Sequence, residues 1–438
     1  MADASATTPA ASAAPPAGGV QTFACPNCGG TIGIRAAGLT VSAVCEHCHS
    51  IVGVDNENLK IISKASAAAV RSALPIGGRG KLFDVEWEII GFMVRSDPTE
   101  KWKWCEYLLF NPWEGFRFLV EAEGHWNFVR MLRRNIRGGA GVPVISYEDE
   151  IYRLYVYDGA KVLYVMGEFY WTVKVGEKVM AADYIAPPYM LSMERSGQDI
   201  IWSQAVYVEA SEVASAFGAQ ALPGQSGVAP DQPSPFEPRY KSTMMTCAMF
   251  LVALIAVQIA GLFASHSQTL YANSYMASPG EKGQTVISTS FTAPEDTVNL
   301  WIHAFAPVDN NWLELDTSLV NLQTQADYGP LLSIEYWHGY DSDGSWSEGS
   351  RNASHTVGDA APGNYQFTVS PDAGAFEKGN PQSFEIEIKN NVPIWSNFWI
   401  SLVLIIIWPA VYLFRRRNFE VQRWSNSDYS PYASDDDE

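Results

Sequence analysis

The chain has 438 residues, 47% of them hydrophobic, and a formal net charge of −19 at pH 7. This length leaves room for two or three domains, and the acidic balance excludes general nucleic-acid binding, which depends on Lys and Arg contacts to phosphate. Residues 1–22 are rich in Ala, Ser, Thr and Pro and lack the basic and apolar regions of a cleavable signal peptide. We expect this segment to be a disordered tail.

Two Cys-x-x-Cys pairs stand sixteen residues apart within residues 23–55, and their members are Cys25, Cys28, Cys45 and Cys48. Two such pairs let four thiolates converge tetrahedrally on one Zn²⁺ from two turns. The spacing predicts a zinc ribbon with a structural ion, because four cysteines leave no coordination position for a reacting water. A rubredoxin-like iron site and thiol redox chemistry are the alternatives, and His47 and His49 are expected to lie outside the ligand set.

Short aromatic runs alternate with polar residues between residues 75 and 217 and are interrupted by Gly, Asn-Pro and Asp-Gly turns. This pattern is typical of antiparallel β-strands and predicts an aromatic β domain made of one or two small barrels. Cys105 and His125 are the candidates here for a nucleophile and its base. Since Cys105 stands in an apolar strand and His125 near a turn, we interpret both as structural residues.

Five stretches of this domain form a recognisable pattern: WCEYLLFNP (104–112), GFRFL (115–119), GHW (124–126), GEFYWTVKVGE (167–177) and DYIAPPYMLSME (183–194). They resemble DUF4178, a bacterial domain of unknown function, over roughly residues 75–213. The cysteine-rich segment before the domain and the apolar segments after it are also similar to those of long members of that family. The resemblance implies a bacterial envelope protein and assigns no catalytic residue.

Two segments of twenty-one residues, 244–264 and 394–414, contain no formally charged residue. A helix of this length rises about 30 Å, which matches the hydrocarbon core of a bilayer. We therefore expect two transmembrane helices, with buried core helices as the alternative. Residues 218–243, before the first segment, are rich in Pro, Gly and Gln and predict a flexible linker.

The Lys and Arg residues within fifteen positions of these segments indicate their orientation. One, Lys389, lies between the segments, and six lie on the side of the termini: Arg239, Lys241, Arg415, Arg416, Arg417 and Arg423. Because positively charged flanks stay in the cytoplasm, both termini are predicted to be cytoplasmic. The only cysteine after residue 105 is Cys247, within the first segment, which agrees with a reducing compartment for the N-terminal half. With the resemblance, this predicts a two-pass protein of the bacterial cytoplasmic membrane.

Residues 265–393 contain sixteen Asp and Glu but only four Lys and Arg. Apolar and polar residues alternate again in this segment, in at least six candidate strands. We expect an extracytoplasmic β-sandwich. One loop, residues 340–348, contains three carboxylates beside aromatic residues, namely Asp341, Asp343 and Glu348. Such oxygen ligands suit a cation, and an aromatic neighbour suits a sugar ring. A solvated hairpin turn is the alternative, and a glycosidase pair drawn from these carboxylates is a further one.

The predicted fold class is mainly β, with an N-terminal zinc ribbon, a cytosolic small β-barrel domain and two transmembrane helices that flank an extracytoplasmic β-sandwich. Residues 415–438 form a basic and then acidic cytoplasmic tail. The predicted function is a membrane-anchored, non-enzymatic scaffold or sensor that couples the outer sandwich to cytosolic interaction modules in envelope maintenance or stress response. Its expected partners are the lipid bilayer, cytosolic proteins and an envelope ligand. The alternatives are an enzyme subunit, which hydrolyses a glycan outside or acts on a small amine inside, and an accessory subunit of a transporter.

Overall fold

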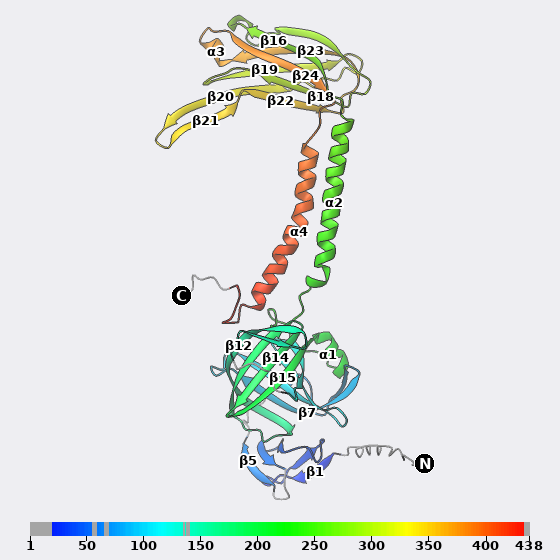
Figure 1. Ribbon diagram of the computed structural model, residues 1–438, viewed down its shortest axis with the longest axis vertical. Helices are drawn as coiled ribbons and strands as arrows, with labels where there is room; N and C mark the ends of the chain where they lie inside the picture. The colour runs from blue at the N-terminus through cyan, green and yellow to red at the C-terminus, as the bar shows by residue number, and fades with distance from the viewer. Residues whose placement is uncertain (1–19, 55–58, 65–69, 135, 137–140, 433–438) are drawn as a thin grey trace, which may run out of the picture. The chain divides into compact units, whose positions relative to one another are not determined.

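The structure, a computed structural model, describes residues 20–54, 59–64, 70–134, 136 and 141–432. Most of the predicted disordered tail at residues 1–22, and residues 433–438 of the predicted acidic tail, lie outside these ranges. The fold is mainly β, with 48% strand and 18% helix, which confirms this part of the predicted fold class. The chain divides into two compact units, residues 1–240 with 411–438, and residues 241–410. Each unit is described by itself (Figure 1).

Five short strands open the first unit. The first two pair with each other and the other three extend a larger sheet; they are β1 (Gln21–Ala24), β2 (Thr31–Ile34), β3 (Ser42–Val44), β4 (Ser50–Gly53) and β5 (Lys60–Lys64). These strands carry the two cysteine pairs in the turns that precede β2 and β4.

A closed antiparallel barrel of eight strands follows. In order around the ring, its strands are β12 (Glu150–Phe169), β13 (Lys178–Ala186), β14 (Tyr189–Ser196), β15 (Asp199–Val208), β10 (His125–Met131), β9 (Gly115–Ala122), β8 (Lys103–Asn111) and β7 (Val85–Ser96). Strand β7 pairs back with β12 and closes the ring. The sequence predicts one or two small barrels in this region, and the structure has one.

Closure depends on the length of β12. Its first half pairs with β13 between Arg153 and Lys161, and its second half pairs with β7 between Lys161 and Gly167. One strand is thereby hydrogen-bonded to both ends of the barrel sheet. Three short elements lie against the barrel strands: β6 (Arg79–Leu82) pairs with β7, β11 (Val144–Tyr147) pairs with β12, and helix α1 (Ala210–Phe217) contacts β6.

The predicted flexible linker at residues 218–243 differs from the structure. Between Gly218 and Phe236 the chain has no helix or strand, but it is bonded to the barrel. The Asp231 side chain is fully buried, Gln225 Nε2 donates to the Tyr207 hydroxyl at 3.1 Å, and a Cβ built on Gly124 would lie 2.4 Å from the Gly224 carbonyl oxygen. A composition rich in Pro and Gly predicts the absence of helix and strand. It does not predict whether the segment packs against the rest of the protein, and here the segment does.

Two long helices, α2 (Glu237–Ala264) and α4 (Ser396–Arg423), cover the predicted apolar segments except for residues 394 and 395. Each has 28 residues, their mean hydropathies are 2.4 and 2.0, and no part of either apolar window is buried. Both are long and apolar enough to cross a membrane. Helix α2 begins seven residues before the predicted segment 244–264, and α4 ends nine residues after the segment 394–414. The added turns contain Glu, Arg and Lys, which are good helix formers that a hydropathy criterion excludes.

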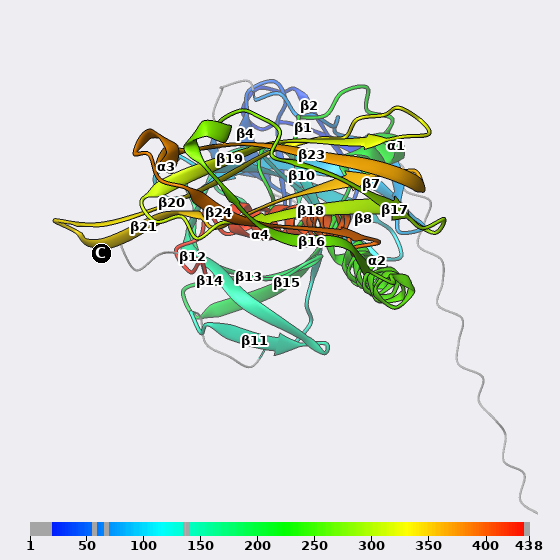
Figure 2. The ribbon, with the colours of Figure 1, turned by 90° about the horizontal axis from the view of Figure 1, so that it is seen from above.

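The second unit contains a β-sandwich of two antiparallel sheets. One sheet has the order β16 (Gln268–Ala277), β24 (Gln382–Asn390), β18 (Asn299–Phe305) and β22 (Asn352–Gly358); the other has the order β17 (Ile287–Ala293), β23 (Gly363–Ala373), β19 (Asn311–Asn321), β20 (Leu331–Asp341) and β21 (Gly344–Ser350). Figure 2 shows the sheets edge-on as two layers, with β19 and β23 in one and β24, β18 and β16 in the other. Inward side chains of both sheets form one apolar core, and two short helical turns complete the unit, η1 (Pro279–Glu281) and α3 (Gly374–Glu377).

Tyr365 is a polar anchor of this core, and its removal gives a test of the fold. The Tyr365 side chain is fully buried and its hydroxyl donates to the Ala361 carbonyl oxygen at 2.6 Å. Tyr365→Phe should lower the free energy of unfolding of the sandwich by about 1 kcal/mol, because the part-buried Ala361 carbonyl loses the shorter of its two hydrogen bonds and keeps only the one from Asn321 Nδ2 at 3.4 Å. Thermal unfolding of the full chain in detergent measures this. The matched control is Tyr340→Phe, at a side chain that is 83% exposed; equal effects of the two changes would contradict the prediction.

Candidate metal centre

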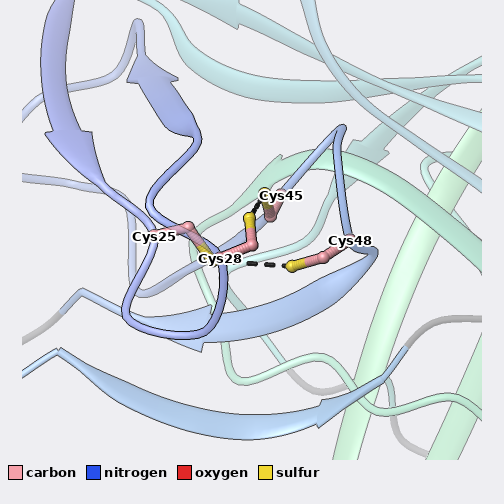
Figure 3. Close-up of side chains that lie close together, drawn as sticks. All are labelled: Cys25, Cys28, Cys45 and Cys48. Carbon is pink, nitrogen blue, oxygen red and sulfur yellow. Dashed lines mark hydrogen bonds between the residues drawn. The ribbon is translucent and has the colours of Figure 1, made fainter.

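Four cysteine side chains converge in the N-terminal part of the first unit (Figure 3). Their sulfur atoms all lie within 4.8 Å of one another, and the pairs Cys25–Cys48 and Cys28–Cys45 have Sγ–Sγ distances of 3.6 and 3.7 Å. A tetrahedral Zn²⁺ with Zn–S bonds of about 2.3 Å requires sulfur atoms about 3.8 Å apart. The four side chains therefore lie close enough together to share one metal ion.

The two cysteine turns have the same backbone construction. In each turn the residue after the second cysteine donates its N–H to the carbonyl of the first cysteine: Gly29 to Cys25 at 2.8 Å, and His49 to Cys45 at 2.9 Å. Both donors have a positive φ, +75° for Gly29 and +56° for His49. Glycine adopts this conformation without strain, whereas His49 adopts it at some cost. The histidine thus has a backbone role, and the group of side chains that could share an ion contains cysteines alone.

The thiols have unequal acidities because their sulfur atoms lie close together and differ in their hydrogen-bond partners. The hydrogen bond between Cys48 and the Ser50 hydroxyl is the main cause that lowers the pKa of Cys48 to about 5. The Gly30 N–H favours the Cys28 thiolate, but the adjacent Cys48 sulfur raises the pKa of Cys28 to about 12. One thiolate forms easily and its neighbour then resists ionisation, since like charges repel. A divalent cation would remove this repulsion and hold all four groups as thiolates.

The buried carboxylate of Glu168 joins the cysteine-bearing segment to the barrel. Strand β3 pairs with the end of β12, where Glu168 is opposite Ala43. The Glu168 carboxylate is 1% exposed and accepts three hydrogen bonds: from the Arg35 N–H at 2.7 Å, the Ala36 N–H at 3.2 Å and the Thr40 hydroxyl at 2.7 Å. Burial raises the pKa of Glu168, and the three donors oppose that shift. This contact fixes the cysteine segment relative to the barrel.

A second group of charged side chains lies inside the barrel. Arg95 Nη1 on β7 is 3.1 Å from Glu106 Oε1 on β8 and 2.5 Å from Glu194 Oε1 on β14. Strands β7 and β14 are not neighbours in the ring, so the second ion pair crosses the interior. Nearby, burial raises the pKa of Asp183 on β13 to about 6 although Ser192 donates a hydrogen bond to it. These residues could not be identified from the sequence, because the alternation of apolar and polar residues along a strand does not show which face of the strand lines the barrel interior.

Cys105 and His125 are not placed as a nucleophile and base. Cys105 is opposite Glu121 on the neighbouring strand, and burial together with the Glu121 charge raises the pKa of Cys105 to about 12. The thiol is therefore protonated at neutral pH. The His125 ring is bonded to the Tyr207 hydroxyl at 3.0 Å and to the Ser226 carbonyl oxygen at 3.2 Å, so both ring nitrogens already have partners.

The three loop carboxylates of the sandwich lie on the hairpin of β20 and β21 and are exposed. Asp341 Oδ1 accepts the Asp343 N–H at 2.9 Å, which closes the turn. Glu348 is opposite Trp337, four residues before Asp341 along β20, and at about 3.4 Å per residue this separates Glu348 from the turn by about 14 Å. The structure brings the two aspartates together and leaves Glu348 apart, and in the described part of the chain these carboxylates do not form a group that could share an ion.

Comparison with protein families supports the predicted resemblance over the barrel. Residues 75–210 match the model of DUF4178, described as a domain of unknown function. The match covers β6 to β15 and does not extend to the cysteine segment, the long helices or the sandwich. No curated protein matches the chain.

Solved structures share only a distant likeness with this chain. A structure of the Gt strain of infectious bursal disease virus is 9% identical over 81% of this chain and 67% of its own, with a TM-score of 0.17. The insecticidal delta-endotoxin Cry8Ea1 of Bacillus thuringiensis is 9% identical over 73% and 54%, with a TM-score of 0.15. An exo-beta-1,3-galactanase from Phanerochaete chrysosporium is 9% identical over 84% and 95%, with a TM-score of 0.14. At these scores the likeness supports no conclusion about fold or function.

Metal analysis of the purified full chain tests the centre. We expect one zinc ion per chain, lost in Cys25→Ser and Cys45→Ser because three thiolates bind Zn²⁺ far more weakly than four. Cys105→Ser is the matched control and should keep the zinc. Iron in place of zinc, or zinc that persists in both ribbon variants, would contradict this prediction.

The Glu168 contact predicts a selective loosening of the cysteine segment. Glu168→Ala leaves three donors without their acceptor and should destabilise the docking of residues 35–43 by about 1–3 kcal/mol. Hydrogen–deuterium exchange of peptides from that segment should accelerate, while peptides from β14 and β15 keep their wild-type rates. Glu88→Ala is the control, since Glu88 forms an ion pair with Arg35 that is more exposed to solvent, and it should have a smaller effect.

Proposed function

We propose that this protein is a non-enzymatic scaffold or sensor of the bacterial cytoplasmic membrane. Helices α2 and α4 cross the bilayer, the β-sandwich lies outside, and the barrel, the cysteine segment and both termini lie in the cytoplasm. The cysteine segment is a zinc ribbon with a structural ion. The outer sandwich binds an envelope ligand, the inner domains bind cytosolic proteins, and the helices couple the two in envelope maintenance or stress response.

The observation that carries this proposal is the exposure of two 28-residue apolar helices. No residue of α2 is buried, and the large side chains of Phe263 and Phe414 are 83% and 71% exposed. Exposing apolar surface to water costs about 25 cal/mol of free energy per Å², and this cost disappears when the surface contacts lipid instead. A soluble protein would cover such surfaces with other elements. A bilayer is the environment that suits both helices along their full apolar length.

The distribution of charge supports the orientation. The flanks on the side of the termini carry six Lys and Arg, including Arg415, Arg416 and Arg417 at the end of the second apolar segment. The residues between the helices have sixteen acidic and four basic side chains. Basic flanks favour the cytoplasm, and an acidic outer domain suits a cationic ligand or a basic partner surface.

The construction of the first unit supports a role in binding rather than catalysis. A four-cysteine shell leaves no open position for a substrate on the metal. Glu168 holds the ribbon on the barrel, so ribbon and barrel present a fixed surface to a partner. Fixed domains on a membrane anchor are suited to assembling other proteins.

Cysteine labelling of intact cells tests the orientation. Ser342→Cys lies in an exposed turn of the sandwich and Asn426→Cys lies at an exposed position after α4. A membrane-impermeant maleimide should label Ser342→Cys in intact cells and Asn426→Cys only after permeabilisation. Labelling of both or neither in intact cells would overturn the two-pass arrangement and, with it, the coupling role. The unmodified chain is the control and should stay unlabelled in intact cells, because its native cysteines lie inside or within the first span.

A further inference from the structure

Two neighbouring residues hold the C-terminal end of α4 against the barrel. Arg423 is 2% exposed, and its Nη1 donates to the carbonyl oxygens of Ala229 at 3.2 Å and Pro230 at 2.8 Å. The Tyr155 hydroxyl on β12 donates to the Arg423 carbonyl oxygen at 3.0 Å. Trp424 is 6% exposed and packs on Tyr155, with ring centroids 5.5 Å apart. The helix end is thus bound both to a barrel strand and to the segment that precedes α2.

The segment that binds Arg423 is itself anchored by one acid. Asp231 directly follows the two carbonyls and is fully buried, and its Oδ1 accepts a hydrogen bond from Asn127 Nδ2 on β10 at 3.3 Å. The other oxygen of each group, Asp231 Oδ2 and Asn127 Oδ1, is buried without a partner. Two acceptors cannot bond to each other. A proton on Asp231 Oδ2 supplies the missing donor, and the acid and the amide can then form two hydrogen bonds as a closed pair.

We propose that the contact between the end of α4 and the barrel is a pH-sensitive latch. With a proton on Asp231, the acid–amide pair holds residues 229–232 on β10, and the carbonyls of that turn hold Arg423. Loss of the proton leaves a buried anion against the Asn127 carbonyl oxygen, which weakens the turn and releases the end of α4. Burial raises the pKa of Asp231 to about 7, so the change takes place near neutral pH.

The charged and titratable groups around Asp231 come from several elements. Arg423 on α4 favours the Asp231 anion, while Asp183 on β13 opposes it. Glu420 accepts from Arg423 Nε at 2.9 Å and from Nη2 at 3.2 Å, which directs part of the guanidinium charge away from Asp231. Tyr207 on β15 also faces Asp231 and is bonded to His125. The net effect of burial and these neighbours favours the protonated acid.

The direction of the pH effect follows from proton binding. The pKa of Asp231 is about 7 with the latch closed, against an ordinary value of 3.8. Between these values the closed state binds a proton that the open state has lost, so the closed state becomes less stable as pH rises, and the effect levels off above about pH 7. The opening constant should increase about tenfold from pH 6 to pH 8.

Hydrogen–deuterium exchange of the full chain in detergent tests the latch. Exchange of peptides within residues 418–432 is compared at each pH with that of Asp231→Asn, which keeps the size of the side chain and makes both hydrogen bonds with Asn127 without a titrating proton. Comparison at equal pH cancels the intrinsic pH dependence of exchange. The ratio of wild-type to variant rates should rise about tenfold between pH 6 and pH 8.

A ratio that stays constant across this range would overturn the proposal. Trp424→Ala provides the second measurement, because it removes a contact of the closed latch that does not titrate, and it should accelerate exchange of the same peptides at both pH values. Unchanged rates in Trp424→Ala would also overturn the proposal. All contacts of the latch lie within the first unit, so neither result depends on the membrane orientation proposed above.

Discussion

The pairing of β12 with both ends of the barrel sheet is the interaction on which the first unit depends. This strand has twenty residues, about four times the length of an average strand. Two irregularities, at Leu154/Val156 and Val162/Tyr164, interrupt its register, and such bulges bend a strand and increase its twist. The bends let one strand follow the curvature of the barrel while it changes partner. Its far end reaches the cysteine segment through Glu168, and its near end reaches α4 through Tyr155.

Buried ionisable side chains mark the points where separate parts of the first unit meet. Glu168 binds the cysteine segment, Arg95 connects β7 with β14 across the barrel, and Asp231 holds the segment before α2. Each would cost several kcal/mol if buried without partners. They are satisfied in different ways: Glu168 by two backbone N–H groups and the Thr40 hydroxyl, Arg95 by two carboxylates and Asp231 by a neutral amide. Because each needs a particular partner, each also excludes other ways of joining the same parts.

Local sequence patterns predict the strands, helices and cysteine turns of this protein, but they do not predict which of these elements contact one another. The cysteine pairs are predictable because ligand spacing is set within two short turns, and the apolar helices because length and composition suffice. Barrel closure is not predictable from the sequence, because β7 and β12 are far apart in the chain. The alternation of apolar and polar residues identifies a strand but not the strand with which it pairs. Arg423 illustrates the limit: in the sequence it is one of six flanking basic residues, and in the structure it is buried against two carbonyls. Asp231 likewise lies in a segment whose composition suggests a free linker.

The base of the sandwich has a construction that suits the proposed coupling. Short connections, residues 265–267 and 391–395, join the sandwich strands to α2 and α4. Asn390 Oδ1 accepts the Gln268 N–H at 2.9 Å, and Asn299 bonds both the N–H and the carbonyl of Val392. The strand that enters the sandwich and the strand that leaves it are therefore bonded to each other where the connections begin. In the proposed coupling, a ligand that shifts one of these strands must shift the other or break these bonds, so the connections to α2 and α4 would move together rather than independently.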